Sequence, residues 1–367
     1  MRSDSDAAIR AVEVNAYRIP TDGPESDGTL EWNSTTLVLV RITAGGRKGI
    51  GYSYADAASA TLVRDVLAGV IEGRDALQTA ARWADMLQAV RNLGREGIAA
   101  MAVSAVDAAL WDLKGKLLDA PVAHLLGGAA RDAVPAYGSG GFTSYDTDRL
   151  QRQLGDWAAQ GFTRVKMKVG RQPMHDVERV HAAREAIGHG VELFIDANGG
   201  YTRKQALLMA ERFAACHVCW FEEPVPSSDV AGLRLLRDRA PAGMDISAGE
   251  YGFDLLHFRR LLEAGAVDVL QADATRCGGL TGFMRAAALC EAFGLPLSSH
   301  CAPALHVAAC CCAPTAVHLE WFHDHQRIER RLFDGAPQPR DGMLAPDLSR
   351  PGLGLEFKEA DAREYAL

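Results

Sequence analysis

From about residue 133 the chain repeats one unit, a short apolar strand followed by a helical segment, and this repeat limits the possible folds more than any other feature. Alternating strands and helices of this length predict a parallel sheet, and eight strands predict a closed barrel rather than an open sheet. The expected strands are Val134–Ser139, Thr163–Val169, Leu193–Asp196, Val218–Glu223, Asp245–Ala248, Val267–Gln271, Leu295–Ser298 and Val317–Glu320. Helical patterns between them include Arg149–Gln160, Asp176–Ile187 and Arg203–Ala214.

The first 130 or so residues follow a different pattern. Ala11–Arg18 and Thr35–Thr43 are rich in β-branched residues and partly alternating, which predicts strands, and an Ala/Leu-rich helical stretch follows from Ala60 to Leu118. A few strands followed by helices predict a separate α+β domain. The last residues contain several Pro and Gly and are expected to form a loop-rich tail. Three parts are therefore expected, residues 1–130, 131–330 and 331–367, with the tail returning to the first domain or the bottom of the barrel.

The segment Pro20–Ser34, between the first two expected strands, is polar and contains several acids and one aromatic residue, Trp32. We predict a loop here, and it is long for a plain hairpin connection. Long loops in compact domains are often functional lids. Two interpretations therefore stay open: a lid in which Trp32 contacts the substrate, and a solvated connector.

The charge balance limits the classes of partner that this chain is expected to bind. With 39 basic and 47 acidic residues the net charge is −8, which argues against a nucleic-acid or anionic-membrane surface. No apolar run approaches the roughly 18 residues of a membrane span, and no secretory signal is visible. The eight cysteines are expected to be buried free thiols, as in a reducing compartment. We therefore expect a cytoplasmic homo-oligomer that acts on a small molecule.

Polar side chains stand at the carboxyl ends of the expected strands, where barrels carry their chemistry. Asp196, Glu222 and Glu250 follow three consecutive strands, which lie about 4.8 Å apart, so their carboxylates can converge on a hard cation such as Mg²⁺. The alternative is structural ion pairing, but no Arg or Lys adjoins any of the three in sequence. The whole series is Lys166, Lys168, Asp196, Asn198, Glu222, Glu223, Glu250, Asp273, His300 and Glu320.

Candidate bases flank these acids. Lys166 and Lys168 are two residues apart on one strand, so both are expected to project into the barrel. Two neighbouring ammonium groups lower each other's pKa, which suits one of them to general-base work. On the other side, Asp273 and His300 end the sixth and seventh strands, and a carboxylate beside an imidazole fixes its tautomer. A Lys-x-Lys pair alone is more often a surface feature.

Read in order, these motifs resemble the enolase superfamily, mandelate racemase subgroup. The resemblance spans nearly the whole chain and implies a modified TIM barrel, (β/α)7β, with an N-terminal α+β capping domain. It also implies that Asp196, Glu222 and Glu250 hold Mg²⁺, with Glu223 outside the coordination sphere. The motifs are Lys166-Met-Lys168, Ile195-Asp196-Ala197-Asn198, Trp220-Phe221-Glu222-Glu223-Pro224, Ala248-Gly249-Glu250, Asp273 before Gly278-Gly279, and His300.

The same resemblance implies catalytic roles. Lys168 would be the base on one face of the substrate, and His300, oriented by Asp273, would be the base or acid on the other. Three further residues would contact the substrate: Lys166 its carboxylate, Glu320 the enolate oxygen as a hydrogen-bond donor, and Asn198 the 2-hydroxyl. A sister branch, the lactonizing enzymes and dipeptide epimerases, carries a Lys on strand six, where this chain has Gln271-Ala272-Asp273.

The expected reaction is removal of the α-proton of a carboxylate to give an enediolate, whose charge a metal and nearby cations stabilise. Our first hypothesis is dehydration of a sugar acid, an aldonate, a uronate-derived acid or an aldarate, because Pro20–Ser34 is polar. The second is a racemase or epimerase of a 2-hydroxy acid, since bases are present on both sides. A non-catalytic binding barrel would predict a damaged site, and every expected position is filled.

Overall fold

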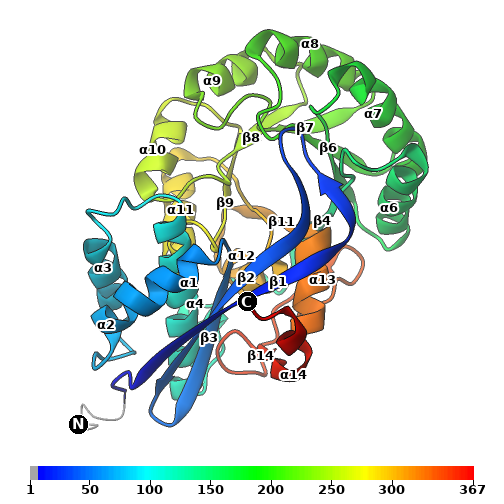
Figure 1. The fold of residues 1–367 in the computed structure, drawn as a ribbon. Helices are drawn as coiled ribbons and strands as arrows, with labels where there is room; N and C mark the ends of the chain where they lie inside the picture. Colours follow the sequence, from blue (N-terminus) through cyan, green and yellow to red (C-terminus); the bar gives the residue numbers. More distant parts are fainter. Residues whose placement is uncertain (1–6) are drawn as a thin grey trace.

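Eight parallel strands close into a barrel (Figure 1). The computed structural model describes residues 7–367. Neighbouring strands pair in chain order, and the last pairs with the first, Leu319 opposite Ala136, so the sheet has closed as predicted. The strands are β4 Val134–Gly140, β5 Arg164–Lys168, β6 Glu192–Asp196, β7 Val218–Glu222, β8 Asp245–Ala248, β9 Val269–Ala272, β10 Leu297–Ser299 and β11 Ala316–Phe322.

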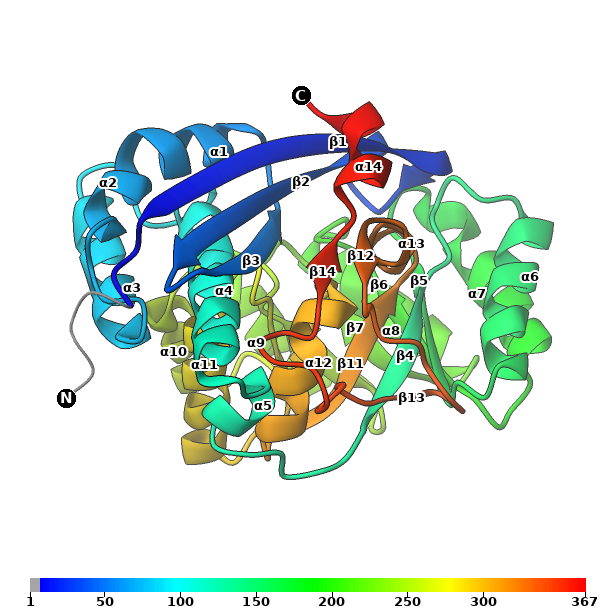
Figure 2. The same ribbon diagram turned by 90° about the horizontal axis from the view of Figure 1, so that it is seen from below.

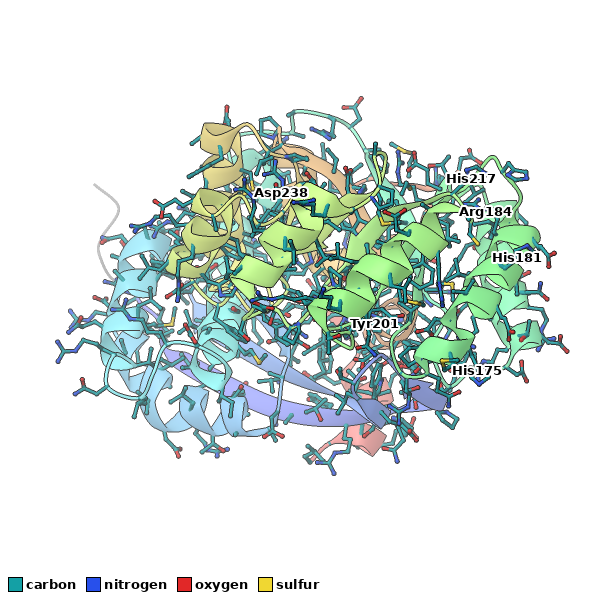
Figure 3. All side chains as sticks on the ribbon, turned by 90° about the horizontal axis from the view of Figure 1, so that it is seen from above. His175, His181, Arg184, Tyr201, His217 and Asp238 are labelled. Carbon is teal, nitrogen blue, oxygen red and sulfur yellow. The ribbon has the colours of Figure 1, made fainter. Side chains whose placement is uncertain are left out.

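Helices cover the outside of the barrel, one after each of the first seven strands. Figure 3 shows α7, α8 and α9 side by side on this outer surface, with His175 and His181 of α7 turned to solvent. Arg184 of α7 instead turns inward and donates to the carbonyls of Gly188 and Val191. The helices are α6 Thr147–Ala159, α7 Pro173–Ile187, α8 Arg203–Ala214, α9 Val230–Arg239, α10 Leu255–Glu263, α11 Gly279–Phe293 and α12 Pro303–Cys312.

Aromatic side chains fill the barrel interior. Phe194 and Trp220 stack with ring centroids 5.0 Å apart, and Tyr137 and His318 pack against them. Burial lowers the pKa of His318 to about 3, so this imidazole is neutral. The charged strand ends therefore lie next to a layer of closely packed rings, and Trp220 Nε1 of this layer donates to Glu222 Oε2 over 3.0 Å.

The capping domain combines a three-stranded antiparallel sheet with helices, which confirms the predicted α+β domain. The long helix α4 packs directly on β3 because Gly51 has no side chain, and a Cβ there would lie 2.2 Å from the Ala109 backbone nitrogen. The elements are β1 Ala11–Ser26, β2 Glu31–Ala44, β3 Arg47–Tyr54, α1 Ala58–Leu62, a π-helical turn Val63–Leu67, α2 Ala68–Ile71, α3 Thr79–Ala89, α4 Ile98–Leu118 and α5 Val122–Leu125.

The predicted loop over Pro20–Ser34 is wrong, because β1 and β2 continue through it as a long hairpin with a register shift between Pro20 and Glu25. In Figure 1 the two strands run from the cap across the mouth of the barrel. At the tip, a Cβ on Gly28 would lie 2.1 Å from the Ala197 carbonyl oxygen. Pairing between the strands satisfies the polar backbone of this segment, a long-range contact that its composition does not reveal.

The C-terminal segment crosses the barrel and ends against the cap (Figure 2). β13 pairs antiparallel with β4, and the backbone N–H of Leu367 donates to Ala16 of β1 over 3.0 Å. The elements here are α13 His323–Leu332, β12 Phe333–Asp334, β13 Met343–Leu344, β14 Glu356–Phe357, α14 Glu359–Ala362 and a 3₁₀ turn Arg363–Tyr365. Within residues 7–367, no helix combines the length and the apolar character that crossing a membrane would require.

Candidate metal and proton-transfer site

Three carboxylates from adjacent strands meet at the barrel mouth. Strand register sets two of them side by side, since Asp196 of β6 pairs with Glu222 of β7. Glu250 reaches the same point two residues after β8, past Gly249, whose φ is 136° and where a Cβ would lie 2.2 Å from the Gln271 carbonyl oxygen. One carboxylate oxygen of each residue lies within 4.8 Å of the other two, and all three residues are buried.

Cations from neighbouring elements contact these acids. Lys168 Nζ lies 2.5 Å from Asp196 Oδ2, and Lys166 Nζ lies 2.6 Å from a Glu222 oxygen. The sequence shows no adjacent Lys or Arg, but β5 lies beside β6 and supplies both lysines. Ion pairing and metal binding therefore share the same carboxylates.

The predicted lowering of the lysine pKa values is wrong in direction. Burial does lower the pKa of Lys166 and of Lys168, but Glu222 and Glu320 beside Lys166, and Asp196 beside Lys168, outweigh it, so both values are raised. The prediction counted the two ammonium groups and omitted the acids of the facing strands. Both lysines are therefore held as ammonium ions in this arrangement.

The acid cluster keeps features that suit a divalent cation. Burial raises the pKa of Glu222 well above its usual range, and the Asp196 carboxylate raises it further. Glu250 Oε2 and Glu223 Oε1 are buried without a hydrogen-bond partner among the described residues. A donor set of carboxylate oxygens with unsatisfied positions fits a hard ion such as Mg²⁺.

His300 stands opposite the lysines, after β10. Its Nδ1 lies 2.7 Å from Asp273 Oδ2, and its Nε2 lies 3.3 Å from Glu250 Oε2. Burial raises the pKa of Asp273, but its hydrogen bond to His300 and the charge of that ring outweigh this, so the pKa is lowered. The ionised Asp273 accepts the Nδ1 proton, which leaves Nε2 as the nitrogen that faces the acids.

The backbone after His300 takes an unusual path. Cys301 and Ala302 have φ of 52° and 40°, in the left-handed region that favours glycine. In this path the Cys301 N–H donates to Glu320 Oε2 over 2.7 Å, and the Ala302 N–H donates to His325 Nδ1 over 3.3 Å. These two contacts join the His300 loop to β11 and α13.

Glu320 on β11 accepts hydrogen bonds rather than donating them. Its Oε1 accepts from the Ser139 hydroxyl over 2.6 Å and lies 2.9 Å from Lys166 Nζ. Burial raises the pKa of Glu320, but Lys166 outweighs it and the pKa is well below its usual range. Donation to a substrate oxygen, as the resemblance implies, would require Glu320 to be protonated.

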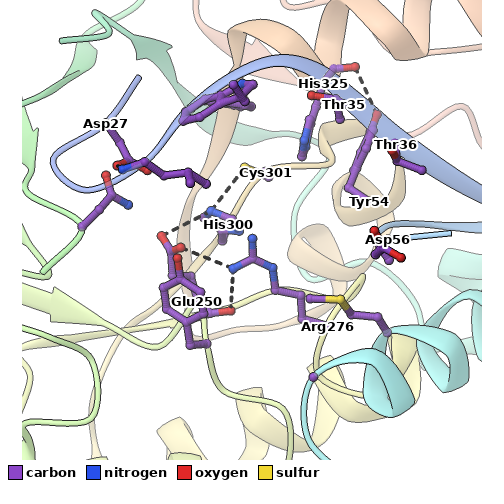
Figure 4. A pocket seen from close by; sticks show the side chains of 18 of the residues that line it. Asp27, Thr35, Thr36, Tyr54, Asp56, Glu250, Arg276, His300, Cys301 and His325 are labelled. Carbon is purple, nitrogen blue, oxygen red and sulfur yellow. Dashed lines mark hydrogen bonds and ion pairs between the residues drawn. The ribbon is translucent and has the colours of Figure 1, made fainter. Parts of the chain in front are cut away.

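A cavity of about 560 Å³ opens above the acids, between the barrel and the cap (Figure 4). Lys168, Asn198, Glu250 and His300 line it, whereas Lys166 and Glu320 are not among the described lining residues. Asn198 Oδ1 is buried there without a hydrogen-bond partner among residues 7–367.

The cap contributes residues to the cavity wall, including Trp32, as the lid hypothesis requires. Asp22 and Glu25 of the same hairpin do not line it. Sequence reasoning missed Tyr54, Asp56, Tyr251, Arg276 and His325, which also line the cavity. Only Arg276 carries a signal in the sequence, as a basic residue between Asp273 and the Gly pair.

Fold and site together define a barrel enzyme of the enolase superfamily. Residues 149–361 match the model of the enolase C-terminal domain-like family. Residues 11–127 match the N-terminal domain of the mandelate racemase / muconate lactonizing enzyme family. The chain belongs to the mandelate racemase/muconate lactonizing enzyme subgroup of this superfamily.

Relatives span nearly the whole chain. A D-galactarolactone cycloisomerase of Agrobacterium fabrum is 32% identical, over 98% of this chain and 99% of its own. A solved mandelate racemase/muconate lactonizing enzyme-like protein from Rubrobacter xylanophilus is 57% identical, with TM-score 0.96, over 98% of this chain and 100% of its own. The structure of L-talarate/galactarate dehydratase from Salmonella typhimurium, liganded with Mg and L-lyxarohydroxamate, is 28% identical with TM-score 0.90, over 100% of this chain and 95% of its own.

Proposed function

We propose that this enzyme removes the α-proton of a sugar acid and eliminates the β-hydroxyl as water, which gives a 2-keto-3-deoxy acid. One observation carries the proposal: three buried carboxylates converge between Lys168 and His300, and both of these side chains line one cavity. The magnesium in the solved talarate/galactarate dehydratase supports the metal assignment.

In this proposal Asp196, Glu222 and Glu250 hold Mg²⁺. When bound there, Mg²⁺ supplies positive charge that stabilises the enediolate formed from the substrate carboxylate. Asn198 presents its unsatisfied Oδ1 to the substrate, as an acceptor for the 2-hydroxyl. Trp32 closes the cavity from the hairpin and excludes water.

In this proposal Lys168 and His300 transfer protons on opposite sides of the substrate. Lys168 takes the α-proton as a neutral amine, which requires its ammonium form, held by Asp196 in this arrangement, first to release a proton to solvent. On the other side, His300 acts as the imidazolium: its Nε2–H gives its proton to the β-hydroxyl as the C–O bond breaks, so that water leaves and the ring remains neutral with its proton on Nδ1. Asp273 keeps the other ring nitrogen protonated and fixes the ring orientation. The enol then releases its hydroxyl proton to solvent and takes a proton from solvent at C3, which gives the 2-keto acid.

Lys166 and Glu320 support this site from beneath the cavity. Lys166 is fully buried and bridges Glu222 and Glu320. In the proposal it supplies positive charge on the carboxylate side of the substrate, and Glu320 donates to the enolate oxygen only in a protonated form.

The second candidate is a racemase or epimerase of a 2-hydroxy acid, which the opposed placement of Lys168 and His300 also favours. A panel of aldonates, aldarates and uronate-derived acids, incubated with enzyme and Mg²⁺ and followed by 2-keto-acid formation, separates the two. We expect keto acid from at least one sugar acid. Exchange of the α-proton in D₂O with inversion, and without keto acid from any member, would favour the racemase.

A further inference from the structure

A thiol lies beside the ring nitrogen that His300 turns toward the acids. Cys301 Sγ is 3.3 Å from His300 Nε2, and both residues line the cavity. Figure 4 shows the two side chains next to each other, joined by a dashed line. The proposed reaction uses Nε2 and gives the thiol no part.

The backbone after β10 brings these two neighbouring side chains together. Consecutive residues of an extended strand point to opposite faces. Cys301 instead has a φ of 52°, in the left-handed region, and its thiol turns back to the side of the His300 ring. A nitrogen and a sulfur that could both bind a metal ion therefore lie on the same side of this loop.

Glu320 completes a set of three potential metal ligands. One ligand atom of each of His300, Cys301 and Glu320 lies within 4.8 Å of the other two, and all three residues are buried. Ser139 and Lys166 hold Glu320 Oε1, whereas Oε2 lies on the Cys301 side, where it accepts the Cys301 N–H over 2.7 Å. Nitrogen, sulfur and carboxylate oxygen thus meet in one place.

The spacing and the types of these atoms fit Zn²⁺. Tetrahedral Zn²⁺ holds a nitrogen and a sulfur ligand about 3.6 Å apart, close to the 3.3 Å between His300 Nε2 and Cys301 Sγ. Asp273 Oδ2 lies 2.7 Å from His300 Nδ1, the carboxylate partner that metal-binding histidines usually have. Mg²⁺ prefers oxygen ligands, so the sulfur and the nitrogen select against it.

Negative charge surrounds this set. Glu250 Oε2, which is buried without a hydrogen-bond partner among the described residues, lies 3.3 Å from His300 Nε2. Burial raises the pKa of the Cys301 thiol well above its usual range, and the Glu320 and Asp273 carboxylates raise it further. The thiol is therefore protonated in this structure, and a metal ion that binds the sulfur displaces this proton to solvent.

We propose that His300, Cys301 and Glu320 form a second metal site, separate from the three acids that hold Mg²⁺, and that Zn²⁺ bound there inhibits the enzyme. The cavity gives the ion a path to the site. Inhibition follows because Zn²⁺ would occupy His300 Nε2, the atom that carries the proton for the leaving hydroxyl. Only this inhibition rests on the proposed function, whereas the binding of Zn²⁺ does not.

Co²⁺ tests the site directly, because it occupies zinc sites and a thiolate ligand gives it a sulfur-to-metal charge-transfer band in the near ultraviolet. Metal-free enzyme is saturated with Mg²⁺, which fills the three acids, and is then titrated with Co²⁺. We expect the band to saturate at one Co²⁺ per chain and to disappear when Zn²⁺ is added. Absence of the band in the wild type overturns the proposal.

Variants assign the band to this site. Cys301→Ser keeps the size of the side chain and removes the sulfur, so the band should be absent. Cys219→Ser is the matched control and should keep the band, because Cys219 lies in β7 outside the cavity and is the only one of the eight cysteines in residues 7–367 that is not buried. A band that persists in Cys301→Ser, or that Cys219→Ser also removes, overturns the proposal.

Asp273→Asn provides a second variant that leaves all three ligands in place. Loss of the carboxylate behind His300 should weaken Co²⁺ binding about 10–100-fold. Circular dichroism checks that each variant is folded, and if Cys301→Ser does not fold, Asp273→Asn decides. Unchanged Co²⁺ affinity in Asp273→Asn contradicts the role of His300 as a ligand.

Turnover tests the inhibition. Zn²⁺ should inhibit 2-keto-acid formation equally at low and at high Mg²⁺, and Cys301→Ser should need at least about tenfold more Zn²⁺ for the same inhibition relative to its own rate. Inhibition that excess Mg²⁺ relieves would mean that Zn²⁺ replaces Mg²⁺ at the three acids, and it overturns the proposal, as does the absence of inhibition.

The two readouts separate this site from the proposed function. If no acid yields keto acid but the Co²⁺ band appears and depends on Cys301, the dehydratase proposal fails and the metal site stands. If keto acid forms but the band is absent, the metal site fails and the dehydratase proposal stands.

Discussion

Glu25 offers a test of how the β1–β2 hairpin is held in place. Its side chain is fully buried; Oε2 accepts from Trp32 Nε1 over 2.8 Å, and Oε1 has no partner among the described residues. Burial raises its pKa to about 8, and the Asp324 carboxylate contributes in the same direction. Glu25 is therefore expected to stay protonated at neutral pH in the folded chain.

The size of the pH effect on the free energy of unfolding follows from proton linkage. The unfolded chain releases the Glu25 proton near its ordinary pKa of 4.5, and the folded chain near 8. Between these values the folded state binds more protons, so the free energy of unfolding falls as pH rises through this window and then levels off. The ceiling is about 1.4 kcal/mol per pH unit. Water that reaches the ionised Glu25 carboxylate reduces this change in the free energy of unfolding. We therefore expect a total change of ~2 kcal/mol between the unfolded and the folded pKa of Glu25.

The perturbation is Glu25→Gln, which keeps the side-chain size and removes the titration. Denaturant unfolding between pH 5 and 9 should show the variant gaining stability relative to the wild type as pH rises, by ~2 kcal/mol in total. Glu13→Gln, at an exposed position of the same strand, is the control and should run parallel to the wild type. Parallel curves for Glu25→Gln would refute the reasoning, because they would mean that Glu25 titrates alike in both states.

Three further predictions concern the reaction and the lid. Chelation should abolish turnover and Mg²⁺ should restore it, with no such rescue in Asp196→Asn; full turnover by metal-free enzyme would contradict the metal assignment. Lys168→Ala and His300→Asn should each lower the rate about 10²–10⁴-fold. Asp273→Asn should lower it nearly as much, because the variant no longer fixes the tautomer of His300. A racemase would instead show each base variant still exchanging the α-proton of one enantiomer in D₂O. Trp32→Ala should change KM and substrate preference, and some loss of Tm is expected because the variant also removes the hydrogen bond to the buried Glu25; unchanged kinetics would leave the hairpin tip without a role in binding.

The sequence by itself determined the barrel and the chain positions of its acids. Strand and helix periodicity is local, and a closed parallel barrel brings every strand end to one face, so Asp196, Glu222 and Glu250 could be placed together before any contact was known. Their pairing in register follows from the same repeat. The order of the motifs was enough to identify the family.

Only the tertiary structure decided the electrostatics and the lining of the cavity. The lysine pKa values depend on acids of adjacent strands, and the path of Pro20–Ser34 depends on pairing between β1 and β2. Asp56 and His325 reach one cavity from opposite ends of the chain. Charge interactions act through space over a few ångströms, and spacing along the chain does not encode which distant segments fold to that distance.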